Sequence, residues 1–280
     1  MFPIGRFLVA LKESVEVFSE HPKFILPKLA VTLLYSIAII FSVKFIVESF
    51  SSPGLSDLVS GLVVLAIELI ALVVDTIVSL MFPLLVKQVR EGKIPSFRLA
   101  LKSVSSNFWR SVMPVALMFC LIGALTMAWA FVYLFILGGT MDPQDPAIIF
   151  FFAPLVLLVL VAAFLFYMIF PVSTLESRSV GASLGRAIRL SLSNWVDVAK
   201  ALAVSFVLAG LSLILAIALN FISEEQSILF WAAFIIVRFL TAYIGTFTYI
   251  LNPVFYFHFS GMPTSVQPKA TGAAKAQRRK

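Results

Sequence analysis

The chain has 280 residues, of which 61% are apolar and only 12% are charged, and its formal net charge is +7. Typical soluble domains carry about 25% charged residues, so this composition excludes an ordinary soluble protein. The apolar residues also form long blocks rather than an alternating pattern. They predict an all-α, polytopic membrane protein.

The first 23 residues do not have the pattern of a secretory signal peptide. Acidic and basic side chains interrupt this segment every few residues, and it has neither an uninterrupted apolar core nor a small-residue cleavage site. We expect it to be an amphipathic helix of the folded protein.

Six apolar stretches follow, and each is long enough to cross the roughly 30 Å of hydrocarbon in a bilayer. They cover residues 25–48, 58–83, 112–137, 147–170, 199–220 and 227–253. The connections 49–57, 138–145 and 220–227 are short and contain no Lys or Arg. The pattern predicts six transmembrane helices joined on one side by short turns.

The basic residues are distributed asymmetrically about these six stretches. Apart from Lys44 and Arg238, which lie deeper within spans, every Lys and Arg falls on the side that holds both termini. The positive-inside rule therefore predicts a multi-pass protein of the cell membrane with cytoplasmic N- and C-termini. We divide it into a membrane domain, 1–262, and a disordered basic cytoplasmic tail, 263–280, which either contacts anionic lipid or serves solubility.

A threefold repeat organises the membrane domain. The triplets Ala10-Leu11-Lys12, Ala100-Leu101-Lys102 and Ala187-Ile188-Arg189 share one pattern, with an apolar residue three positions before each alanine and an aromatic residue eight positions after it. This spacing predicts an amphipathic helix at the start of each repeat. We expect three parallel repeats, at about 5–94, 95–181 and 182–262.

Each predicted repeat continues through a pair of membrane helices. We expect the spans to end at Pro83, Pro171 and Pro253, and a glycine turn to follow at Gly92, Gly181 and Gly261. For the amphipathic segments two interpretations stay open. They either lie in the cytoplasmic interface, with basic side chains among lipid headgroups, or merely extend the spans that follow.

Two segments carry a resemblance to a known group of proteins. These are ALKESVEVFSEHPKFILPKL, residues 10–29, and SLGRAIRLSLSNWVDVAKALAV, residues 183–204. The chain to about Gly261 resembles uncharacterised six-helix prokaryotic membrane proteins that are similar to the membrane domain associated with glycerophosphodiester phosphodiesterases. The resemblance implies a six-helix fold, but no phosphodiesterase activity, because the catalytic domain is not part of this chain.

The candidate intramembrane polar site consists of Glu68, Asp75, Arg238, Thr241 and Asn252. Glu68 and Asp75 are seven residues apart in the second predicted span and so share one helical face. Charges in a bilayer require a partner or a wet cavity. One interpretation is a structural Glu68–Arg238 ion pair, and the other is a polar pathway for protons or small solutes.

Enzyme chemistry has little support in the sequence. A GxSxG string occurs at 181–185, but a nucleophile elbow needs a preceding strand, and here an apolar span precedes it. We interpret it as a glycine turn with Ser183 capping the next helix. We expect no enzyme activity, no cofactor or metal, and no nucleic-acid partner. A scaffold or accessory protein that binds lipid or partner subunits is our first hypothesis, and a small transporter or channel is the alternative.

Overall fold

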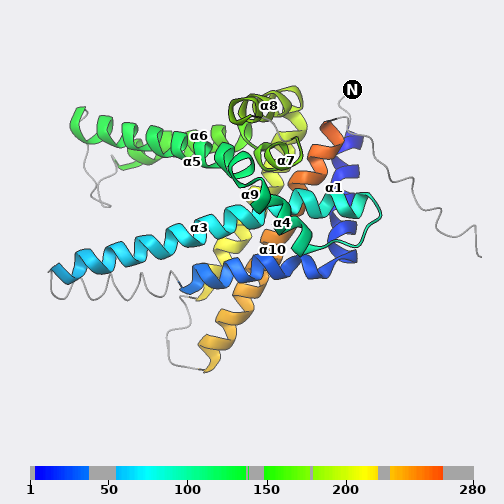
Figure 1. Ribbon diagram of the computed structural model, residues 1–280. Coiled ribbons are helices and arrows are strands. Elements are labelled where there is room, and N and C mark those ends of the chain that lie inside the picture. The colour runs from blue at the N-terminus through cyan, green and yellow to red at the C-terminus, as the bar shows by residue number, and fades with distance from the viewer. Residues whose placement is uncertain are drawn as a thin grey trace, which may run out of the picture.

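The computed structural model describes residues 4–37, 55–136, 138, 148–176, 179–219 and 228–260. Every regular element in these ranges is a helix, which confirms the all-α prediction for the described part of the chain (Figure 1). The elements are α1 Ile4–Glu20, η1 Pro22–Phe24, a helix over 25–37, α3 Leu55–Arg90, α4 Phe97–Ser106, α5 Phe108–Phe131, η2 Val132–Ile136, α6 Ile148–Leu165, α7 Ile169–Leu175, α8 Val180–Ser193, α9 Trp195–Leu219 and α10 Ile228–Phe259.

Among the described residues, five helical stretches are long and apolar enough to cross a membrane. They are Gly61–Arg90, Phe108–Ile136, Ile149–Leu175, Trp195–Ile217 and Phe230–Phe259, and they overlap the second to sixth predicted spans. The first predicted span, 25–48, is helical over 25–37, and its remainder lies outside the described residues. The length and composition of these helices indicate a membrane-embedded protein.

The helices continue past the prolines at which we expect the spans to leave the membrane. Pro83 lies inside α3 and Pro253 inside α10, and both helices continue beyond them to Arg90 and Phe259. An internal proline costs a helix about 3 kcal/mol. Here one neighbour of each proline, Phe82 and Val254, is fully buried, so packing offsets this cost.

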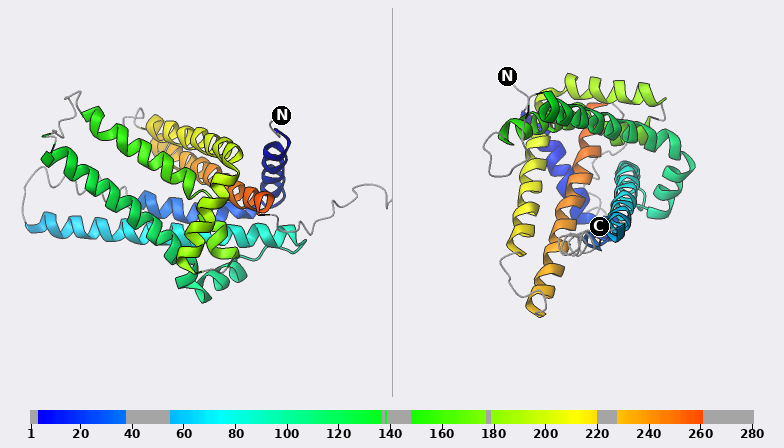
Figure 2. Two further views of the ribbon diagram at one scale, coloured as in Figure 1. Left: turned by 90° about the horizontal axis from the view of Figure 1, so that it is seen from above. Right: turned by 90° about the vertical axis from the view of Figure 1, so that its left-hand side faces the viewer.

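The amphipathic helices α1, α4 and α8 are separate from the helices that follow them. Each pair is divided at one residue with similar backbone angles: φ −126° and ψ 62° at His21, −114° and 29° at Asn107, and −121° and 33° at Asn194. The interpretation that these segments merely extend the spans is therefore wrong. α1 even runs across the direction of α3 (Figures 1 and 2).

The predicted glycine turns differ in their outcome. Gly92 follows the end of α3 with φ 70°, a left-handed conformation that glycine adopts without strain. Gly181, by contrast, is helical, because α8 already begins at Val180 after Ser179. Ser183 is thus not a helix cap but a buried residue one turn into α8. Gly261 lies outside the described residues.

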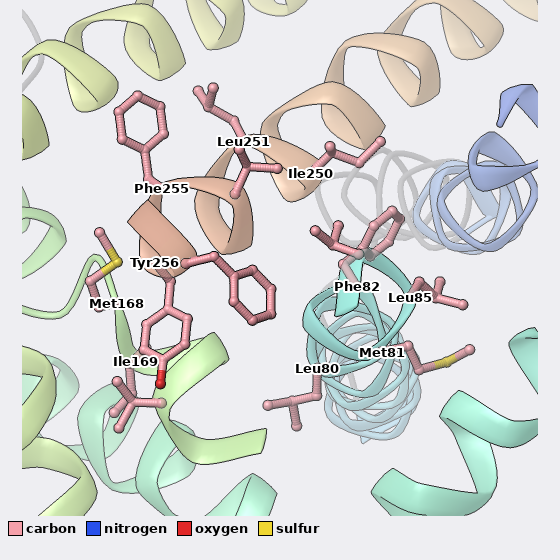
Figure 3. Packing of buried hydrophobic residues seen from close by; sticks show 14 of the residues in the cluster. Leu80, Met81, Phe82, Leu85, Met168, Ile169, Ile250, Leu251, Phe255 and Tyr256 are labelled. Atoms are coloured by element: carbon pink, nitrogen blue, oxygen red, sulfur yellow. The ribbon is translucent and has the colours of Figure 1, made fainter. Parts of the chain in front are cut away.

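Buried side chains gather where the helices converge, at the end of the molecule that we call the base. It comprises residues 80–86 of α3, 168–172 at the start of α7 and 250–257 of α10, together with parts of α1, α4 and α8. Figure 3 shows side chains from α3, α7 and α10 packed together there. A continuous core of this kind holds segments from all parts of the chain in one unit.

Away from the base the long helices diverge, and their far halves expose apolar side chains (Figure 2). The exposed residues include Leu62, Leu65 and Leu69 of α3, Phe135 and Ile136 of η2, Phe150 of α6, Leu213 and Ile214 of α9, and Ile228 and Ile235 of α10. An apolar surface this extensive is untenable in water and fits contact with acyl chains or other membrane helices.

Candidate functional site

Asp75 is the centre of a polar trio that joins three helices. The Lys28 ammonium, from the helix over 25–37, donates to Asp75 Oδ1 at 2.9 Å and to the Tyr249 hydroxyl of α10 at 3.0 Å. Tyr249 in turn donates to Asp75 Oδ1, at 3.0 Å. Each member of the trio bonds the other two, so the charges of Lys28 and Asp75 compensate each other between the helices.

Local sequence makes room for this trio. Lys28 Nζ also lies 4.4 Å from the centroid of the Tyr249 ring, an attractive cation–π arrangement. Gly245 lies one turn before Tyr249, and a Cβ atom there would come within 2.9 Å of Lys28 Cε. The missing side chain at Gly245 therefore lets the lysine stem pass across α10.

The structure does not join Glu68 and Arg238 in an ion pair. The Arg238 guanidinium lies over the Phe234 ring, 4.8 Å from its centroid, and its Nε atom is buried without a hydrogen-bond partner. The carboxylate of α3 that the structure places against α10 is Asp75, which accepts a hydrogen bond from the Tyr249 hydroxyl.

Thr241 and Asn252 make separate contacts rather than a continuous polar path. The Thr241 hydroxyl donates to the Val237 carbonyl of its own helix at 2.8 Å. The Asn252 amide donates to the carbonyl of Tyr167, in the turn that separates α6 from α7. Asn252 thus satisfies a backbone acceptor that the helix break leaves open.

A second ionic cluster lies in the base. Arg90, near the end of α3, binds Glu13 of α1 through two nitrogens, Nε at 2.6 Å and Nη2 at 2.7 Å. His258 Nε2, from the last turn of α10, lies 2.8 Å from Glu13 Oε2, the oxygen that Arg90 Nη2 also binds. Burial by itself would raise the pKa of the Glu13 carboxyl, but the hydrogen bonds and charges of His258 and Arg90 lower it to about 2.

A third cluster ties α10 to α8. The Tyr256 hydroxyl donates to Glu176 Oε1 at 2.8 Å, and Arg186 Nε lies 3.3 Å from the same oxygen. The Glu176 side chain is only 6% exposed, so its charge depends on these donors. Like the trio at Asp75, this cluster holds together helices that are distant in the sequence.

Sequence reasoning identified Asp75 but missed both of its partners. Lys28 was grouped with the basic residues of the cytoplasmic side, although it stands inside the apolar stretch 25–48. A lysine in that position requires a carboxylate, and Asp75 was available. Tyr249 gave a weaker signal, because a tyrosine in an aromatic-rich helix is ordinarily a packing residue.

The chemistry of the described residues favours structural contacts. In the ranges that the structure covers, no group of three or more His, Cys, Asp or Glu is placed to hold a metal ion. Ser183 of the GxSxG string lies within helix α8 and is fully buried, a setting unlike a nucleophile elbow.

Comparison with known proteins gives no further guide to this site. No protein-family model matches the sequence, and no curated protein or solved structure matches it significantly.

Proposed function

We propose that this protein is a multi-pass scaffold or accessory protein of the cell membrane that binds lipid headgroups and partner subunits. The observation that carries the proposal is the closed trio of Lys28, Asp75 and Tyr249. Charged groups on a transport path need to exchange partners as the substrate passes, whereas these groups compensate one another and fix three helices together.

The surface that remains for interaction suits binding. The far halves of the long helices are apolar, and the opposite end of the molecule carries exposed basic side chains, including Arg98, Lys102 and Arg110. Trp109 and Trp195 are 71% and 60% exposed and stand at the beginnings of α5 and α9. Tryptophan and basic side chains at the end of an apolar helix favour the membrane interface.

A threefold repeat with six spans is part of this proposal. Ala10, Ala100 and Ala187, the aligned alanines, are all buried. Asn107 and Asn194, at equivalent helix breaks, each donate a side-chain hydrogen bond to the backbone carbonyl four residues earlier. These correspondences support three related units, with the amphipathic helices placed at the cytoplasmic interface. The resemblance to the phosphodiesterase-associated membrane domain is consistent with this accessory role.

A small transporter is the second candidate. It is favoured by three of the six buried side-chain polar atoms that lack a hydrogen-bond partner in the described part of the chain: Tyr167 Oη, Asn252 Oδ1 and Arg238 Nε. Buried polar atoms are normally satisfied, so such exceptions mark places where water or a solute binds. Two of the three lie close together, because Asn252 donates to the Tyr167 carbonyl.

Proteoliposomes that contain a trapped pH-sensitive dye separate the two candidates. An imposed potassium diffusion potential should drive no more proton flux than in protein-free liposomes, and Asp75→Asn should leave this result unchanged. A flux that depends on the wild-type protein and disappears with Asp75→Asn would instead establish the proton-linked alternative. Glu16→Gln, on the exposed face of α1, is the matched control for loss of a carboxylate.

A further inference from the structure

Arg238 is a charged side chain in an apolar helix without an ionic partner among the described residues. Its guanidinium contacts the Phe234 ring at 4.8 Å, and its Nε is buried without an acceptor. The neighbouring side chains of Ile235 and Phe239 are apolar and exposed. The arginine therefore stands at the edge of a surface that faces the bilayer.

Its depth along α10 brings the guanidinium within reach of the membrane boundary. Trp231 lies seven residues nearer the far end of the helix, or about 10 Å, and is 48% exposed. Exposed tryptophans favour the headgroup level. Because Arg238 extends over Phe234, four residues earlier in the helix, its side chain points toward that boundary and shortens the remaining distance.

The energetic cost of this arrangement calls for an anion. An arginine in a membrane helix is costly unless it is hydrated or paired, and its long side chain relieves the cost by reaching the interface. At that level every phospholipid carries a phosphate group. A guanidinium binds phosphate through two parallel hydrogen bonds, which matches its planar geometry.

We propose that Arg238 binds the phosphate of a phospholipid in the leaflet at the far end of α10. The acyl chains of that lipid would lie along the exposed apolar side chains of Ile235 and Phe239, and Trp231 would border its headgroup. This site is distinct from the basic surface at the base of the molecule. It depends on α10 crossing the bilayer and not on the scaffold role.

Counting bound phospholipid tests this site directly. Wild-type protein, Arg238→Gln, Arg238→Lys and the control Lys93→Gln are stripped of lipid in mild detergent and titrated with dioleoyl phosphatidylcholine, with native mass spectrometry as the readout. Dioleoylglycerol, which lacks phosphate, serves as the second ligand. Lys93 is exposed in the turn after α3, so its substitution removes a positive charge elsewhere.

We expect Arg238→Gln to weaken the tightest phosphatidylcholine binding about tenfold or more, as loss of charged hydrogen bonds implies. Lys93→Gln should leave that binding unchanged, Arg238→Lys should retain part of it, and dioleoylglycerol should not bind preferentially to wild type. Equal phosphatidylcholine binding by wild type and Arg238→Gln would overturn the proposal. So would wild-type protein that binds no phospholipid tightly. If Arg238→Gln does not fold, Arg238→Lys is compared with wild type instead. Equal phosphatidylcholine binding by these two proteins would then overturn the proposal.

Discussion

At the scale of single residues, the effect of a charged side chain on stability depends less on its position in the chain than on the groups that it contacts. Lys28 and Asp75 have side chains only 14% and 20% exposed, yet the trio with Tyr249 gives each of them a bonded partner. Lys12 and Glu16 also form an ion pair, but their side chains are 79% and 59% exposed. Water screens the second pair, so the two pairs should differ greatly in their effect on stability.

Removing one member of the buried pair should therefore be costly. We expect Lys28→Met to lower the free energy of unfolding by about 3–5 kcal/mol, because the Asp75 carboxylate loses its counter-ion. The double substitution Lys28→Met with Asp75→Leu should lose less than Lys28→Met alone, since no unpaired charge remains. Lys12→Met should change stability by less than about 1 kcal/mol. Unfolding in mixed micelles measures all three, and a double variant less stable than both singles would contradict the pairing.

The Glu13 carboxylate makes stability depend on acid pH. Its pKa is about 2 in the folded protein against an ordinary value of 4.5, so the folded state binds this proton less readily than the unfolded state. Its stabilising contribution is complete above about pH 4.5 and is lost as the pH falls toward 2. In thermal unfolding experiments between pH 7 and pH 3, the stability of Glu13→Gln should fall less with acidification than that of wild type. Glu16→Gln, a change at an exposed carboxylate, should lose stability with falling pH as wild type does.

At the scale of helices, the apolar blocks predicted the long elements well because bilayer thickness imposes a minimum length on a span. The breaks before α5 and α9 were also foreseeable, since Asn107 and Asn194 follow amphipathic segments. The continuation of α3 and α10 beyond Pro83 and Pro253 could not be deduced from the sequence. Proline signals the end of an isolated helix, but burial of the residues around Pro83 and Pro253 outweighs its local cost, and burial cannot be deduced from local sequence.

The pairing of charges failed for a related reason. Measuring depth from the exit prolines placed Glu68 and Arg238 at one level. In the structure Asp75 contacts Tyr249. Asp75 lies eight residues before Pro83, whereas Tyr249 lies only four residues before Pro253. Equal distances from the two prolines therefore do not place residues of α3 and α10 at the same level. The angle between the helices adds to the error away from the base. Register and crossing angle depend on side-chain packing, which periodicity in one sequence does not describe.

At the scale of the whole molecule, the Glu13–Arg90 ion pair bears on the number of membrane crossings. It holds α1 beside the C-terminal end of α3, while α3 begins at the far end of the molecule (Figure 1). The two ends of the connection between α1 and α3, Glu20 and Leu55, thus lie at opposite ends of the molecule. Our proposal of six spans accordingly places one crossing between them, which together with the five apolar helices of the described residues makes an even number.

An even number of crossings predicts which positions share a side of the membrane. In a Cys120→Ala background, Glu20→Cys and Lys93→Cys should both react with an impermeant maleimide only after cells are permeabilised. Thr140→Cys, in the predicted external turn, should react in intact cells. If the helix that begins at residue 25 did not cross, α3 alone would separate positions 20 and 93, and the two cysteines would label from opposite sides. Agreement between them, with the opposite result at position 140, would support six spans with both termini in the cytoplasm, since positive charge is retained on that side.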